Sequence, residues 1–201
     1  MLIYQHLVCS TIYMVDLYNS GSCPQRAFKK RGAIMATLNV QHETINSNPL
    51  DTVEHLIECN DWAFDRSGDN EIAFQVPGTW CDYSLFFAWN EDVGAIHFSC
   101  AFDMRVPDER RVLVYELLAM VNEKLWMGHF GVWTDEGLPM FRHAMPMRGT
   151  KGPTLDQIED LIDVAIMECD RFYPTFQHVV WGGNTATEAI SAAMIETVGE
   201  A

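Results

Sequence analysis

The chain has 201 residues, of which 48% are hydrophobic and 11% aromatic, so it can build one well-packed domain and is not globally disordered. Its formal net charge of −15 argues against nucleic acid and anionic membranes as partners, because both are bound by clustered Lys and Arg. No uninterrupted apolar run approaches the roughly 20 residues of a membrane span. A cytoplasmic protein is therefore expected.

The charge is distributed unevenly along the chain. Residues 1–34 carry four basic residues and one acidic residue, a net of +3, whereas residues 35–201 carry 9 basic and 27 acidic residues, a net of −18. The change falls just before Met35, so residues 1–34 are expected to be a disordered extension that arises from a misplaced start codon or from cloning. A signal peptide is the alternative, but no basic segment precedes the apolar residues 2–15. Residues 35–201 are expected to form a single domain with a weakly ordered tail after residue 183.

The first half of this domain reads as one helix followed by strands. Asn48 can cap a helix that Pro49 begins, and residues 61–70 are expected to form a loop. Apolar residues then alternate with a period of two over 72–76, 81–89 and 96–106, which predicts three strands. The short turn after residue 89 predicts an antiparallel hairpin.

Helices and strands also alternate in the second half. Asp108 is expected to cap a long helix that ends at Gly128. Strands are predicted over 130–132 and 138–147, the second at a sheet edge because it contains two prolines. Thr154 and Gln157 form a capping box for the last long helix, which Pro174 should end or bend. A weak final helix is expected after residue 184.

These elements predict an α+β fold in the order α-β-β-β-α-β-β-α. Because hairpins rather than single strands separate the long helices, the fold is expected to be an antiparallel sheet of about five strands with helices packed on it.

The central helix is apolar around most of its circumference. Three acidic residues spaced by seven, Glu109, Glu116 and Glu123, mark a narrow polar stripe. A helix this apolar is expected to be buried on two sides, one of them the sheet and the other either the last helix or a second subunit. The candidate dimer or partner surface comprises Leu117, Met120, Val121 and Trp126.

Motifs for catalysis, metals and cofactors are missing from the sequence. One basic cluster in the acidic domain, Arg142, His143, Arg148 and Lys151, is a candidate anion site, although a solvated strand end and loop is the simpler explanation. His97 shares its strand face with Asp103 and Arg105 and is expected to face solvent. The cysteines form no C-x-x-C pair, so Cys81, Cys100 and Cys169 are expected to be buried, reduced thiols.

Several short motifs in the second half of the chain together resemble the YbjN family, a bacterial family linked to sensory transduction. They are Asn122-Glu123-x-Leu125-x-x-Gly128-His129-Phe130, Arg142-x-Ala144-Met145, Gln157-x-Glu159-x-Leu161-Ile162, Asp170-x-Phe172-Tyr173-Pro174-x-Phe176 and Trp181-Gly182-Gly183. The resemblance covers roughly residues 47–198. It implies a fold like that of type III secretion chaperones, which commonly dimerise and hold partner proteins, and it implies no catalytic residues.

The apolar helix and the resemblance together predict a non-enzymatic, chaperone-like or regulatory protein-binding module. It is expected to act as a homodimer with an unidentified protein partner and without a cofactor. The alternative is a small-ligand sensor or cryptic enzyme that binds an anion through the basic cluster in residues 142–151.

Replacing Leu117 or Val121 with Glu is expected to give monomers or to unfold the domain, because a charge would enter an apolar contact. Light scattering distinguishes these results. A stable wild-type monomer would contradict the predicted dimer.

Overall fold

The computed structural model describes the backbone of residues 48–196 and the side chains of residues 48–193. The expectations for residues 1–34 and for the start of the domain at residue 35 lie outside these residues. The division of the chain into an extension and a domain therefore stays a prediction.

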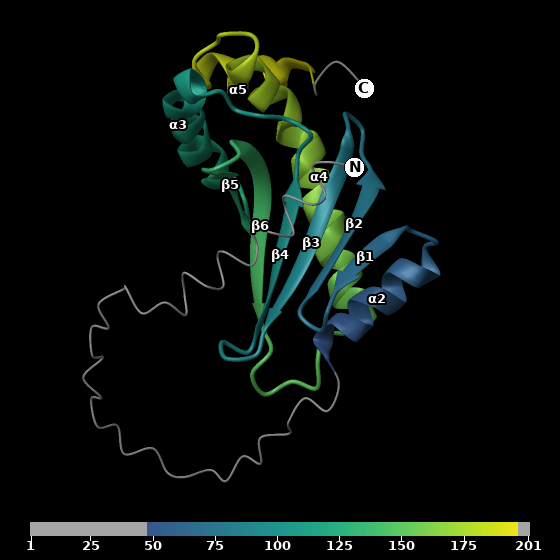
Figure 1. Ribbon diagram of the computed structural model, residues 1–201. Coiled ribbons are helices and arrows are strands. Elements are labelled where there is room, and N and C mark those ends of the chain that lie inside the picture. The colour runs from purple at the N-terminus through teal and green to yellow at the C-terminus, as the bar shows by residue number, and fades with distance from the viewer. Residues whose placement is uncertain (1–47, 197–201) are drawn as a thin grey trace, which may run out of the picture. The chain divides into compact units, whose positions relative to one another are not determined.

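An antiparallel sheet forms the frame of the described domain (Figure 1). Its six strands lie in the order β1-β2-β3-β4-β6-β5, and every neighbouring pair is antiparallel. The strands are β1 (Phe64–Ser67), β2 (Glu71–Pro77), β3 (Asp82–Asn90), β4 (Ala95–Ala101), β5 (His129–Trp133) and β6 (Leu138–Pro146). The α+β class and the antiparallel sheet predicted from the sequence are confirmed, with one strand more than the five expected.

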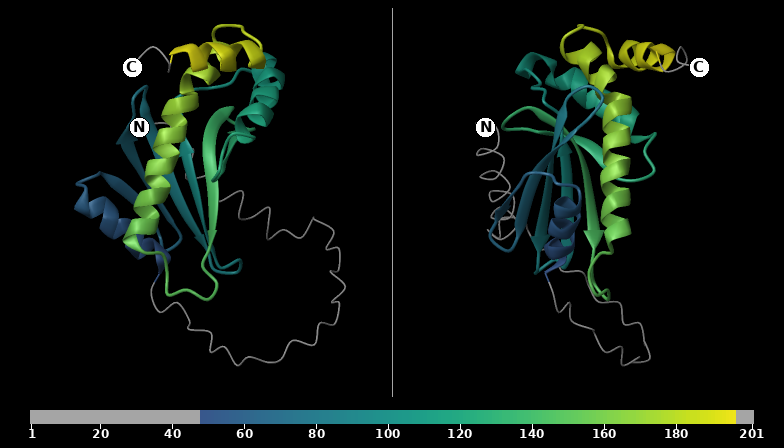
Figure 2. Two further views of the ribbon diagram at one scale, coloured as in Figure 1. Left: turned by 180° about the vertical axis from the view of Figure 1, so that it is seen from behind. Right: turned by 90° about the vertical axis from the view of Figure 1, so that its right-hand side faces the viewer.

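The helices pack against one face and one end of this sheet. They are α2 (Pro49–Cys59), the 3₁₀ helix η1 (Asp108–Arg110), α3 (Arg111–Asn122), α4 (Leu155–Val180) and α5 (Ala186–Glu196). The long helix α4 runs across one face, and α2 contacts both α4 and the strands β2 and β3 (Figure 2). Helices α3 and α5 contact each other and α4. The helix hinted at after residue 184 is thus present as α5.

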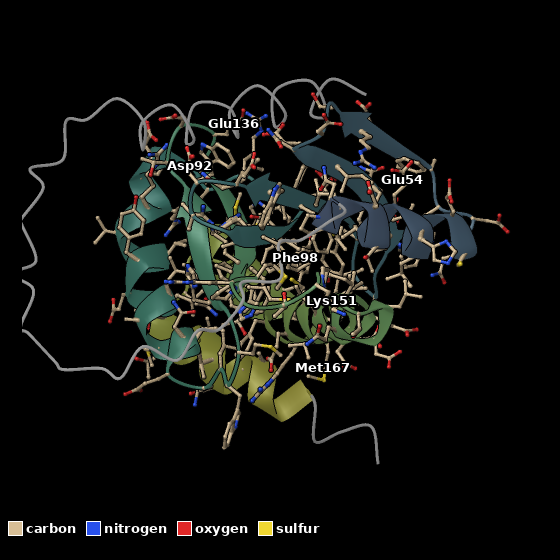
Figure 3. The ribbon with its side chains drawn as sticks, turned by 90° about the horizontal axis from the view of Figure 1, so that it is seen from below. Glu54, Asp92, Phe98, Glu136, Lys151 and Met167 are labelled. Carbon is tan, nitrogen blue, oxygen red and sulfur yellow. The ribbon has the colours of Figure 1, made fainter. Side chains whose placement is uncertain are left out.

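The core lies between α4 and the sheet face that it covers. Alternate strand residues point into it, including Phe74, Phe87 and Phe98, which are at most 1% exposed. Their rings contact one another across three strands, stacked between Phe74 and Phe87 and tilted between Phe87 and Phe98. Figure 3 labels Phe98 among these interior side chains. Helix α4 adds Phe172 and Phe176 to the same core. The period of two in the strands and of three to four in α4 therefore both follow from this one apolar layer.

Two helix starts are as the sequence predicts. The Asn48 side chain accepts a hydrogen bond of 2.9 Å from the Leu50 backbone N–H, which caps α2. Thr154 and Gln157 form the reciprocal capping box of α4, with bonds of 3.0 and 3.1 Å. Short-range capping signals are reliable here because both partners lie within three residues.

The expected loop over residues 61–70 contains strand β1, so that part of the prediction is wrong. Four residues alternate too briefly to be recognised from sequence, and β1 is held by its neighbours. It pairs with β2, and the Arg66 guanidinium forms ion pairs with Asp51 and Glu54 on α2. The N–O distance to Asp51 is 2.9 Å. Contacts with helix α2, which lies outside the local sequence of β1, therefore stabilise a strand that the local sequence does not predict.

The third predicted strand ends five residues early, and β6 is not an edge strand. Strand β4 stops at Ala101, although Phe102, Met104 and Val106 stay buried as their alternation predicts. The Phe102 N–H still donates to the Pro139 carbonyl at 3.1 Å, but Pro139 has no N–H to return the bond. Pro139 thus ends the β4–β6 ladder while β6 itself lies between β4 and β5.

Helix α3 is shorter than expected at both ends. Asp108 does not cap it, because residues 108–110 form a 3₁₀ turn without a side-chain cap. The helix ends at Asn122, whereas Gly128 precedes β5 with a φ of +68°. That glycine lies against the ring of Phe141, and a Cβ placed on it would lie 2.2 Å from the Phe141 Cζ atom. A glycine is therefore required at this position, but because the backbone lies close to the Phe141 ring and not because a helix ends there.

Gly128→Ala is expected to lower the free energy of unfolding by about 3 kcal/mol, because it adds a clash with a core ring to an unfavourable positive φ. Gly94→Ala is the matched control: its φ is +66° and nothing lies within 4 Å of a Cβ there. The control should lose only about 1 kcal/mol. Urea unfolding measures both, and equal losses would contradict the packing argument.

Candidate functional site

The most connected position in the family-like motifs is Asp170, in the middle of α4. The helix was expected to end or bend at Pro174, yet it continues to Val180. Pro174 lacks an N–H and leaves the Asp170 carbonyl without its helical partner. The Trp80 indole N–H donates to that carbonyl at 2.9 Å. The β2–β3 turn therefore satisfies the backbone oxygen that the proline leaves free, and the helix passes through.

The carboxylate of Asp170 binds the same turn. Its Oδ1 atom accepts hydrogen bonds from the Thr79 backbone N–H at 2.9 Å and from the Tyr83 hydroxyl at 2.7 Å, and Oδ2 accepts from the Thr79 hydroxyl at 2.8 Å. The Trp80 ring stacks on Tyr173 with an interplanar angle of 7°. Burial and the hydrogen bond to Asp170 raise the pKa of Tyr83, which therefore stays protonated as a donor. We call these contacts the turn lock.

A second motif residue, Asn122, joins α3 to β5. Its side-chain amide donates to the Phe130 carbonyl at 3.0 Å, and its side-chain oxygen accepts from the Phe130 N–H at 2.7 Å. The side chain therefore replaces the two bonds of a neighbouring strand at the edge of the sheet. This is why α3 ends there and why the chain returns to the sheet through Gly128.

The motif glycine Gly182 also has a structural role. A Cβ on Gly182 would lie 2.7 Å from the His178 carbonyl oxygen, so only glycine fits after the end of α4. Five motif residues thus have a structural role, because they fix the helices to the sheet or to each other: Asn122, Gly128, Asp170, Pro174 and Gly182. These five motif residues do not converge on a reactive site in the described part of the chain.

The candidate partner surface is divided between the core and the exterior. Leu117 and Val121 are 0% exposed and lie inside the domain, so their placement on a contact surface is wrong. Met120 is partly buried against the core, whereas Trp126 is fully exposed. The helix was expected to be buried on two sides, but among the described residues only its inner side is covered, by β5, α4 and α5.

The outer side of α3 carries the exposed apolar residues instead. Val112 is 75% exposed and Tyr115 is 47% exposed, and the exposed Ala119 follows one turn later on the same side. We define the α3 strip as Val112, Tyr115, Ala119 and Trp126. The sequence contained a usable signal for it, since Val112 and Ala119 lie beside the acidic stripe of Glu116 and Glu123, which had to face out.

The basic cluster predicted in residues 142–151 does not form one site. In β6, Arg142 pairs with Ser99 and His143 pairs with the buried Phe98, so their side chains point to opposite faces of the sheet. Arg148 and Lys151 lie exposed in the loop that follows the strand. Adjacent residues of a strand point to opposite faces of the sheet, so basic residues that are close in sequence need not be close in space.

Arg142 instead has other neighbours, on the sheet face turned away from α4. Ser99, Arg142 and His129 pair side by side on β4, β6 and β5, and His97 lies diagonally across from Arg142. We call these four residues the histidine–arginine patch. His97 was expected to face solvent, but burial, followed by the charge of Arg142, lowers its pKa to about 4. His129 was missed because its register with Arg142 is not visible in sequence.

Two cysteines face each other in the core. The sulfur atoms of Cys100 and Cys169 are 3.7 Å apart, both residues are fully buried, and neither forms a disulfide. Burial raises the pKa of the Cys169 thiol, which keeps it protonated. The prediction that these two residues are buried is confirmed. Cys81 is only partly buried.

Within residues 48–193, no three His, Cys, Asp or Glu side chains come together as metal ligands. Across the helices of the described residues, none is long and apolar enough to cross a membrane.

Asp170→Ala is expected to lower the free energy of unfolding by about 2 kcal/mol or more, because three hydrogen bonds to a carboxylate are lost. The measurement is urea unfolding. Asp163→Ala serves as the control, since Asp163 is exposed on the same helix and its side chain forms no hydrogen bond among the described residues. A loss at Asp170 no larger than at Asp163 would show that the turn lock does not stabilise the fold.

A protein family and a solved structure are similar to this chain. The model of the YbjN family, described as "Putative bacterial sensory transduction regulator", matches residues 49–178, from α2 through most of α4. Among solved structures, the crystal structure of YbjN from E. coli, described as a putative transcription regulator, is 14% identical. The match covers 62% of this chain and 90% of that chain, with a TM-score of 0.42. No curated protein matches the chain. Because the family model spans more than half of it, the chain belongs to the YbjN family.

Proposed function

We propose that this domain is a non-enzymatic regulatory module that binds proteins and acts as a homodimer. The family is described as one of sensory transduction regulators, which supports a regulatory role. The motif residues Asn122, Asp170 and Gly182 support the same view, because they connect helices to the rest of the frame and do not combine a nucleophile, a base and an anion-stabilising donor. Binding through an apolar surface is then the activity that the described residues support best.

The observation that carries the proposal is the α3 strip. Three large apolar side chains, Val112, Tyr115 and Trp126, are exposed on one helix and the turn that follows it. Figure 1 shows α3 at one end of the sheet, beside α5. Single exposed apolar residues are common, but exposed apolar residues that neighbour each other on one helix side, as Val112 and Tyr115 do, are typical of a contact surface.

A second copy of this chain is the occupant that we propose for the α3 strip. Residues 111–126 carry two acidic and two basic residues and are therefore neutral, whereas residues 35–201 have a net charge of −18. Two copies of so acidic a domain repel each other least where the local charge is zero. A twofold contact also pairs a surface with itself, and the small Ala119 in the middle of the strip allows two helices to approach closely.

The further roles follow the family resemblance. We propose that the dimer holds an unidentified protein partner in the cytoplasm, as a chaperone-like regulator would. The likeness to type III secretion chaperones is the basis for this and stays a prediction.

Val112→Glu is expected to convert the dimer to a monomer, because each chain would add a negative charge at an apolar contact. The change should leave the fold intact, since Val112 is 75% exposed and an acidic residue in the first turn of a helix is favourable. Light scattering gives the mass, and circular dichroism checks the fold.

Val93→Glu is the matched control, because Val93 is 54% exposed in the turn between β3 and β4, outside the strip. It should remain a dimer. Trp126→Ala should weaken the dimer without adding a charge. A wild-type chain that stays monomeric at about 100 µM, well above the dissociation constants of stable dimers, would overturn the proposal.

A further inference from the structure

A second surface of the domain, the histidine–arginine patch, has the composition of a binding site for an anion. Its four residues come from three neighbouring strands, which lie about 4.8 Å apart. Ser99 pairs with Arg142, and Arg142 pairs with His129, so these three lie in one row across the sheet. His97 pairs with Ala144 and is therefore a diagonal neighbour of Arg142, within reach of a long side chain.

Within residues 48–193, the positive charge in this patch has no acidic partner nearby. Among the ion pairs of the described residues, none involves Arg142, His97 or His129. On the same sheet face, Glu71 lies two strands away from His97, in the same row. Asp65 lies three strands away from Ser99. At these separations neither carboxylate reaches the guanidinium of Arg142.

One donor in the patch is left unused. The Arg142 Nε atom is buried and has no hydrogen-bond partner among the described residues. Its side chain crosses Gly131, where a Cβ would lie 3.7 Å from the Arg142 Cδ atom. A buried donor without a partner is unfavourable, so a ligand that accepts a hydrogen bond from it would gain binding free energy.

The electrostatics of the neighbouring groups point the same way. Burial and then the charge of Arg142 lower the pKa of His97, with smaller effects of His129 and His143. Burial and Arg142 also lower the pKa of His129. At neutral pH the imidazoles are therefore neutral and each can donate one hydrogen bond, while Arg142 stays charged. The patch thus offers one positive charge and several neutral donors.

We propose that the histidine–arginine patch binds the phosphate group of a small ligand. The guanidinium fork matches two oxygens of an oxyanion, and the Ser99 hydroxyl and the two imidazoles can each donate one further bond. Donors from three strands suit a tetrahedral phosphate better than a planar carboxylate, which the fork alone would satisfy. This site is separate from the α3 strip and does not depend on the proposed dimer.

The test is a titration of the full chain with inorganic phosphate and, in parallel, glycerol phosphate, at pH 7 and at constant ionic strength kept with chloride. The signals of the His97 and His129 imidazoles are followed by NMR. Saturable shifts of both signals are expected in the wild type. Tighter binding of glycerol phosphate would identify an organic phosphate as the ligand, and equal binding would identify free phosphate.

The variants locate the site. Arg142→Gln should weaken binding about tenfold or more, since a charged, forked donor is lost. Arg148→Gln, the matched control in an exposed loop, should bind as the wild type does. If Arg142→Gln does not fold, His129→Ala replaces it, because His129 is exposed, and it should bind several-fold more weakly. The proposal is overturned if no imidazole signal shifts in the wild type, or if Arg142→Gln and His129→Ala leave the affinity unchanged.

Discussion

The hydrogen bonds around Asp170 are the constraint on which the rest of this structure depends. A proline in the middle of a 26-residue helix would normally kink or end it, because one carbonyl loses its partner. Here Trp80 donates to that carbonyl from the β2–β3 turn, while the carboxylate of the same residue accepts from Thr79 and Tyr83. The turn therefore satisfies the carbonyl that the proline leaves without a partner, and the helix is continuous. The same hydrogen bonds hold β2 and β3 in position against the helix.

Several residues that identify the family hold the fold together. Asp170 and Asn122 join helices to the sheet, and Gly128 and Gly182 fill positions that a Cβ would occupy. Such residues preserve a frame whatever is bound to it, so membership of the YbjN family says little about the ligand or partner. The surfaces that bind are expected outside these four residues. The α3 strip and the histidine–arginine patch both are, although the patch includes two further motif residues, His129 and Arg142.

Much of the fold could be predicted because its signals are local. Alternation over two residues placed β2, β3 and β4, and capping residues within three positions of each other placed the starts of α2 and α4. The failures have a common physical origin in partners far away in the chain. Strand β1 depends on Arg66 and α2, the length of α4 depends on Trp80, and the end of α3 depends on Phe130.

The candidate sites were harder to predict for the same reason. Arg142 and His143 are adjacent in sequence but on opposite faces of the sheet, whereas Arg142 and His129 are thirteen residues apart and side by side. Which residues meet is decided by strand register, and register is set by the whole sheet. The apolar side of α3 could have been assigned from the acidic stripe alone. That stripe indicates the outer side, and Leu117 and Val121 lie opposite it, in the core.

The central claim is that the exposed side of α3 is where two copies of this protein meet. Hydrogen exchange of the full chain, compared at about 1 µM and about 100 µM protein, tests it directly, because amides in an interface exchange more slowly when the dimer is populated. The account predicts slower exchange at the higher concentration in residues 111–126, with the turn around Val93 unchanged. Equal exchange, where light scattering shows the dimer at the higher concentration only, or protection confined to another segment, would contradict it.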